Sequence, residues 1–180
     1  MMNIKVLLGS NRHIGKHKEL MKNLSSDRHT LDYIELSKST INPCTACEAC
    51  RQEGSCILPN DDDFNTILDE IKSGDVLFIV TPVYAPIPSK LAAFFERVLS
   101  ISFFGGKLGG HDKPLFDKQV GIVSYGANGL YSSDSIKIMI QQFFTDDYDF
   151  ESITYPYIDN EICFENKTLT EYLQEIVNSL

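Results

Sequence analysis

The sequence predicts a doubly wound α/β domain, a three-layer sandwich built on a five-stranded parallel sheet with strand order 2-1-3-4-5. Two observations lead to this prediction. Strand-like and helix-like segments alternate five times along the 180 residues, which is the pattern of a parallel sheet covered on both faces. The segment 76–80 (VLFIV) is an unbroken apolar run, as expected for a strand buried on both sides. At this length the chain, residues 1–180, is predicted to form a single domain.

The first elements are recognised by where apolar residues recur. Segment 3–8 is an apolar run that ends at Gly9 and Ser10, typical of a buried strand leaving its sheet. Leu20 and Leu24 are spaced as on one face of a helix, which predicts a helix over 16–24. Apolar and polar residues alternate over 30–36, which predicts the second strand.

The next helix is predicted over 61–72. Asp61, Asp62 and Asp63 open it, and acidic side chains suit the positive N-terminal end of a helix. This interpretation is favoured over a metal site at the same aspartates. An apolar stripe at helical spacing follows them. The remaining elements are predicted as strands over 76–80, 119–124 and 152–158 and helices over 89–99, 133–144 and 169–180.

Composition narrows the classes of partner. The net charge of −9 and the absence of a basic stripe argue against nucleic acid. No apolar run approaches the length of a membrane span, and the apolar start is too short for a signal peptide. The expected location is therefore the cytoplasm.

Four of the five cysteines lie in one loop, residues 43–57, inserted after the second strand. In a reducing compartment such a group binds metal or performs redox chemistry more often than it forms disulfides. Three interpretations stay open: a [4Fe–4S] cluster, which uses four thiolates; zinc, which usually takes two separated CxxC pairs; and free thiols that pack over a cofactor or at an interface. The candidate ligands are Cys44, Cys47, Cys50 and Cys56, whereas Cys163 stands alone and is expected to be a buried packing residue.

The loop after the first strand, residues 9–17, combines hydroxyl, cationic and glycine residues at the start of a helix. Backbone N–H groups and the helix dipole favour a phosphate at such a place. The alternative is a polar turn in which a serine caps the helix. The residues predicted to contact a phosphate are Ser10, Arg12, Gly15, Lys16 and His17.

Two further loops follow the third and fourth strands, at the edge where ligands bind in this architecture. Three prolines stiffen segment 81–89, and Tyr84 offers a planar surface to an aromatic ligand. Glycines in segment 124–129 allow close backbone approach, although a structural turn explains them almost as well. The residues predicted to contact the ligand are Pro82, Val83, Tyr84, Ala85, Ser124, Tyr125 and Gly126.

Taken together, these motifs resemble the NAD(P)H-dependent FMN reductase family, in its flavodoxin-like branch that includes the archaeal iron–sulfur flavoproteins. The resemblance covers about residues 3–130 and is specific as a set. It implies a flavodoxin-like fold, FMN phosphate in the first loop and the isoalloxazine ring against the other two. The motifs are Gly9-Ser10-x-Arg12-x-x-Gly15, the cysteine loop, Asp62-Asp63, Thr81-Pro82-Val83-Tyr84, Leu91 and Phe94-Phe95-Glu96-Arg97.

The chain departs from the family pattern at two places. Lys16 and His17 stand where members commonly have Asn and Thr or Ser, and they are expected to supply a cationic pair for the phosphate. Segment 85–88 (APIP) replaces an aromatic residue, Gly and a polar residue after Tyr84.

The resemblance implies an FMN-dependent enzyme that takes hydride from NADH or NADPH and passes electrons to a quinone, a nitro compound or free flavin, or through a cluster to a redox protein. No catalytic side chain is expected, because the flavin carries the chemistry. A homodimer or homotetramer is implied too. The rival interpretations are a flavodoxin-like electron carrier that never meets a nicotinamide and an interaction domain without flavin.

Overall fold

The computed structural model describes residues 1–58, 62–83, 87–104, 119–125, 151–155, 157–158, 161–164 and 167–180. A five-stranded parallel sheet with order β2-β1-β3-β4-β5 forms its centre, so the predicted fold class is confirmed. Its strands are β1 (Asn3–Leu8), β2 (Thr30–Glu35), β3 (Val76–Pro82), β4 (Gln119–Tyr125) and β5 (Glu151–Tyr155).

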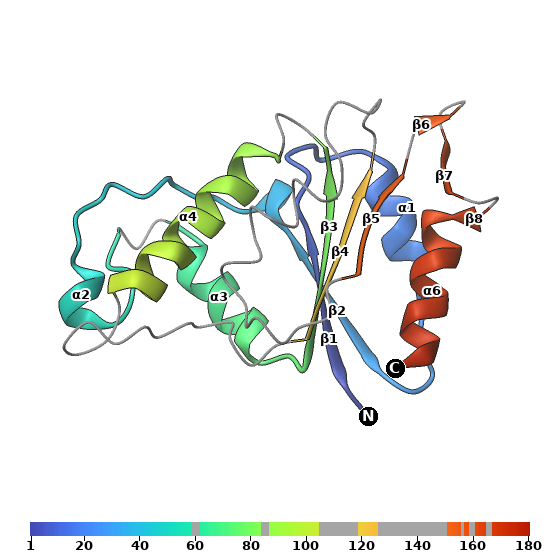
Figure 1. Ribbon diagram of the computed structural model, residues 1–180, viewed down its shortest axis with the longest axis horizontal. Coiled ribbons are helices and arrows are strands. Elements are labelled where there is room, and N and C mark those ends of the chain that lie inside the picture. Colours follow the sequence, from blue (N-terminus) through green and yellow to red (C-terminus); the bar gives the residue numbers. More distant parts are fainter. Residues whose placement is uncertain are drawn as a thin grey trace.

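Helices cover both faces of the sheet (Figure 1). On one face lie α3 (Phe64–Lys72) and α4 (Ser89–Phe104), and on the other lie α1 (Lys16–Asn23) and α6 (Leu169–Ser179). The pleat sends Leu77 and Ile79 into the core under α3 and α4, and Phe78 and Val80 into the core under α1 and α6. This two-sided burial is the physical reason for the unbroken apolar run in β3.

The register places the carboxyl ends of three strands at one edge. Leu8 of β1 pairs with Val80 of β3, and Pro82 of β3 pairs with Tyr125 of β4. The loops that leave these strands therefore start side by side. This edge is at the top of the molecule in Figure 1.

The structure differs from the sequence prediction in several bounds. Strand β2 ends at Glu35 because the chain turns into a 3-10 helix, η1 (Leu36–Lys38), whose carbonyls accept hydrogen bonds from Lys90. Helix α4 continues to Phe104, five residues beyond its predicted end at Leu99. A short helix, α2 (Cys50–Glu53), lies within the cysteine loop.

The predicted strand over 152–158 is divided between two sheets. Its first part is β5, whereas Tyr157–Ile158 form β6, which pairs antiparallel with β7 (Glu161–Phe164). Strand β7 pairs with β8 (Lys167–Thr168), and it contains Cys163. The helix predicted over 133–144 lies outside the described residues. Among the described helices, none is long and apolar enough to cross a bilayer.

Candidate functional site

The first loop, residues 9–17, is closely packed where it leaves β1. The backbone N–H of Gly9 donates to the carbonyl of Val80 at 2.9 Å. A Cβ atom at Gly9 would lie 2.8 Å from both Leu91 Cδ2 and Thr81 Oγ1. No side chain fits there without displacing its neighbours, so this glycine brings the loop against β3 and α4.

Ser10 does not cap the following helix. Its Oγ, which belongs to a buried side chain, accepts a hydrogen bond from the backbone N–H of Arg12 at 3.2 Å. Helix α1 begins after Gly15, and no side chain among the described residues caps it. The capping role that the alternative gave to a serine is therefore wrong, whereas the polar turn itself is present. The N-terminal end of α1 can still receive an anion.

His17, in the first turn of α1, is 1% exposed, and its Nε2 atom has no hydrogen-bond partner within the described part of the chain. Burial lowers the pKa of His17 below its ordinary value of 6.5, against the carboxylate of Glu35, which raises it. Burial therefore favours the neutral imidazole, and the cationic pair of Lys16 and His17 stays a prediction. An unpartnered buried nitrogen marks this turn as a place for a polar ligand.

Two hydrogen bonds join the three predicted loops. The backbone N–H of Val83 donates to the carbonyl of Tyr125 at 2.8 Å, and Asn11 Nδ2 donates to Ser89 Oγ at 2.9 Å. The described members of the predicted flavin site therefore share one edge of the sheet: Ser10, Arg12, Gly15, Lys16, His17, Pro82, Val83, Ser124 and Tyr125. Tyr84, Ala85 and Gly126 lie outside the described residues.

The cysteine loop lies away from α1 and α6, against the C-terminal half of α4 (Figure 1). Its cysteines are free thiols and line one cavity of about 160 Å³. Apolar side chains, Ile57, Leu58 and Ile101, form part of the wall. The ligands predicted from their spacing, Cys44, Cys47, Cys50 and Cys56, are thus brought together around one space.

Hydrogen-bond partners surround the sulfur atoms. Ser100 Oγ lies 3.3 Å from the sulfur of Cys44, and the thiol of Cys50 donates to the Ser100 carbonyl at 3.5 Å. The backbone N–H of Ala49 and the hydroxyl of Thr45 lower the pKa of the Cys47 thiol. These donors stabilise the thiolate of Cys47, the form that binds metal, whereas burial raises the pKa of the Cys50 thiol.

The backbone between the cysteines is strained. Ala46 and Glu48 adopt φ angles of 52° and 57°, in the left-handed region that residues with a Cβ rarely occupy. In the described part of the chain, no three His, Cys, Asp or Glu groups are arranged as a metal-coordination shell. The four thiols that line the cavity match the donor set of a group bound by four thiolates.

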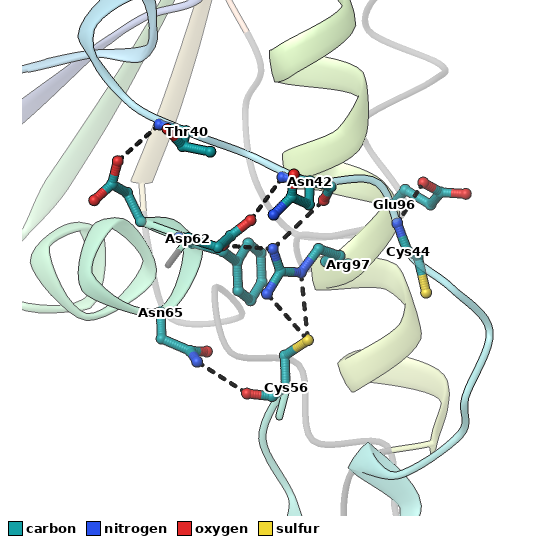
Figure 2. Close-up of polar contacts among 10 residues, drawn as sticks. Thr40, Asn42, Cys44, Cys56, Asp62, Asn65, Glu96 and Arg97 are labelled. Carbon is teal, nitrogen blue, oxygen red and sulfur yellow. Dashed lines mark hydrogen bonds and ion pairs between the residues drawn. The ribbon is translucent and has the colours of Figure 1, made fainter. Parts of the chain in front are cut away.

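A buried ion pair closes the base of the cysteine loop (Figure 2). Arg97 Nη1 lies 2.6 Å from Asp62 Oδ1, and each side chain is 1% exposed. Asp62 also accepts hydrogen bonds from the backbone N–H groups of Asn42 and Phe64, at 2.6 and 2.8 Å. Burial raises the pKa of Asp62, but these hydrogen bonds and Arg97 together hold it below its ordinary value.

Arg97 also reaches the sulfur of Cys56. Its Nε and Nη2 atoms donate to that sulfur at 3.3 and 3.2 Å (Figure 2). The ion pair was not predicted, because the aspartates read as a helix start and Arg97 was only part of a motif. The available signal is an arginine at position 97 within an apolar stripe of Phe94, Val98 and Ile101, where helical spacing places it in the core.

The fold and this edge of the sheet define a flavodoxin-like α/β protein. Its sequence matches the profile of the NADPH-dependent FMN reductase family over residues 2–144. The chain belongs to that family.

Curated relatives include two archaeal proteins named iron–sulfur flavoprotein. The one from Methanosarcina thermophila is 34% identical over 67 residues, which is 37% of this chain and 34% of the relative. The one from Methanocaldococcus jannaschii is 30% identical over 81 residues, which is 44% of this chain and 41% of the relative. The matched regions therefore span less than half the length of these relatives.

Solved structures share the fold at low identity. Smu.1420 from Streptococcus mutans superposes with a TM-score of 0.70 at 16% identity, over 99% of this chain and all of the other. FerB from Paracoccus denitrificans, a flavoenzyme NAD(P)H:(acceptor) oxidoreductase, gives a TM-score of 0.61 at 14% identity, over 99% and 94%.

Proposed function

We propose that this protein is an FMN-dependent oxidoreductase that takes hydride from NADH or NADPH and passes electrons to a small acceptor. A quinone, a nitro compound and free flavin are the acceptor classes that suit this chemistry. Membership of the FMN reductase family supports the proposal. The observation that carries it is the meeting of three loops beyond β1, β3 and β4, where an uncapped helix N-terminus adjoins Ser10 and Arg12.

In this proposal the first loop holds the FMN phosphate. The hydroxyl of Ser10, the guanidinium of Arg12 and the N-terminal end of α1 supply donors and positive charge, and Lys16 opens that helix. Pro82, Val83, Tyr84 and Ala85, with Ser124, Tyr125 and Gly126, would border the ring. The bound flavin supplies hydride acceptance, while the chain binds, orients and excludes water.

We further propose that the four cysteines hold a [4Fe–4S] cluster, which would allow electrons to leave one at a time toward a redox protein. Four thiols around one cavity support this assignment, as does the set of hydrogen-bond donors near their sulfur atoms. Iron and acid-labile sulfide assays on anaerobically purified protein test it. Zinc in place of iron, or metal-free thiols, would contradict it.

The cysteine cavity also keeps a second candidate open, an electron carrier that uses FMN without a nicotinamide. In that case a protein donor would reduce the flavin and NADPH would not. We also propose one domain over 1–180 and a homodimer or homotetramer. Limited proteolysis and light scattering test these two points.

The flavin assignment is tested with the double variant Ser10→Ala/Arg12→Ala. Its matched control is Ser26→Ala/Arg28→Ala, since that pair has the same spacing and the same 3.2 Å bond from the arginine N–H to the serine Oγ. We expect the dissociation constant of FMN to rise at least tenfold in the first variant, which corresponds to a loss of about 1.4 kcal/mol or more of binding free energy, and to stay unchanged in the control. Equal FMN affinity in both variants would contradict the site.

A further inference from the structure

We propose that Arg97 is a positioning residue of the four-cysteine centre, which fixes the sulfur of Cys56 and raises the reduction potential of a cluster bound there. The inference rests on the cluster part of the proposed function. It concerns residues of this chain that lie behind the candidate ligands, on α4 and at the start of α3.

The geometry singles out one sulfur. The Nε and Nη2 atoms of Arg97 both donate to the sulfur of Cys56, and its Nη1 atom donates to Asp62. A guanidinium is planar and permanently charged, so these contacts fix its plane as well as its position. Cys47, by contrast, is exposed.

The backbone of Cys56 is fixed too. Asn65 Nδ2 donates to its carbonyl at 2.9 Å (Figure 2). The Arg97 guanidinium in turn lies over the ring of Phe64, 4.0 Å from its centroid. Cys56 is therefore held from both its carbonyl and its sulfur, which makes it the anchored ligand around which the rest of the loop closes.

A cation within hydrogen-bond distance of a ligand sulfur changes the reduction potential of the cluster. When the cluster accepts one electron, its negative charge increases by one, and N–H donors and positive charge near a ligand sulfur favour that state. Asp62 offsets part of this effect, but it lies behind the guanidinium, whose Nε and Nη2 atoms meet the sulfur directly. The net effect of Arg97 is a higher reduction potential.

The test compares three variants. Asp62→Asn/Arg97→Met removes both charges and leaves no buried ion unpaired. The carboxamide oxygen of Asn can replace one of the two carboxylate oxygens that accept from the backbone N–H groups of Asn42 and Phe64. Arg97→Lys keeps the charge but cannot reproduce the two donors and the ion pair together. The control is Lys90→Met, since Lys90 is another α4 cation but donates to the carbonyls of Leu36, Ser37 and Ser39.

Iron, sulfide and FMN content and the midpoint potential of the iron–sulfur signal are measured on anaerobic protein. We expect a more negative midpoint potential in the double variant, a smaller shift in Arg97→Lys and none in Lys90→Met, with FMN content unchanged throughout. Loss of iron from the Arg97 variants alone, with FMN and circular dichroism retained, also supports the positioning role.

Full iron content with an unchanged potential in both Arg97 variants would overturn the inference. Wild-type protein without iron, even after anaerobic reconstitution, would overturn it together with the cluster. FMN content and NADPH oxidation in that same sample would still decide whether the reductase assignment stands.

Discussion

The features of the site that could not be predicted from the sequence are mostly contacts of single residues. Ser10 and Arg12 could be assigned to the first loop from their types and spacing, and the structure brings them to the predicted edge of the sheet. Arg97 and Asp62 could not be paired in advance, because 35 positions separate them and only the packing of α3 against α4 brings them together. The burial of His17 could not be predicted for a similar reason, since it depends on the whole first turn of α1.

Loss of the Arg97 charge alone should lower the unfolding free energy substantially. The change Arg97→Met leaves the Asp62 carboxylate buried without its cation, and such orphaned charges typically cost about 3–5 kcal/mol. We expect urea denaturation to show a loss of that order in unfolding free energy. The Asp62→Asn/Arg97→Met protein should recover part of it, since no charge is then buried without a partner. Equal losses in the two variants would mean that the ion pair is not what stabilises the base of the loop.

His17 should make stability depend on pH. Because burial lowers its pKa in the folded protein, the unfolded chain takes up the proton first as the pH falls below 6.5. This contribution to stability is complete above that pH and decreases below it until the folded-state pKa is reached. The unfolding free energy of the wild type should therefore fall more steeply between pH 7 and 5 than that of His17→Gln. Parallel curves would show that His17 is accessible to protons in the folded state.

At the scale of elements, α4 connects the two candidate sites. Its first residue, Ser89, meets Asn11 of the first loop, while Glu96, Arg97 and Ser100 contact the cysteine loop. Ser100 lies eleven positions after Ser89 on the helix, about 16 Å at 1.5 Å per residue. The cysteine loop thus packs against the C-terminal part of α4 and does not line the site at the first loop.

The order of strands and helices was predictable because parallel strands covered on both sides leave long apolar runs, of which β3 is the example. The division of segment 152–158 between β5 and β6 was not, since both parts favour strand and only the surrounding sheet decides which pairs form. The length of α4 was underestimated because Ser100 and Ser102 interrupt its apolar pattern. Their hydroxyls donate to the carbonyls of Glu96 and Val98, which lets the helix continue.

A substitution at Gly9 tests whether close packing against β3 and α4 supports the first loop. A methyl group at this position would press on Leu91 and Thr81, so Gly9→Ala should destabilise the fold by about 1–3 kcal/mol and reduce FMN retention. The control Gly54→Ala has open space around it but a φ of 70°, and should cost about 1 kcal/mol through the backbone alone. Thermal melts and FMN content measure both effects. Full FMN retention in Gly9→Ala would show that the close approach of β1 is not needed.

At the scale of the whole molecule, the chain combines a flavin fold with a four-thiol cavity. A nicotinamide delivers two electrons together, whereas an iron–sulfur cluster passes them singly, so under the proposed function the two sites would convert between these modes. The net charge of −9 would favour a redox partner with a basic surface, because complementary charge steers association. We expect flavin binding not to depend on the cysteines, because they contact the far part of α4.

Anaerobic mixing of the FMN-loaded protein with NADPH, and in parallel with NADH, tests the central claim most directly. We predict that the flavin absorbance bleaches within seconds with at least one of the two nicotinamides, and that a quinone or nitro compound then restores it. A flavin that stays oxidised with both, yet is reduced by a protein electron donor, would contradict the reductase assignment and identify an electron carrier instead.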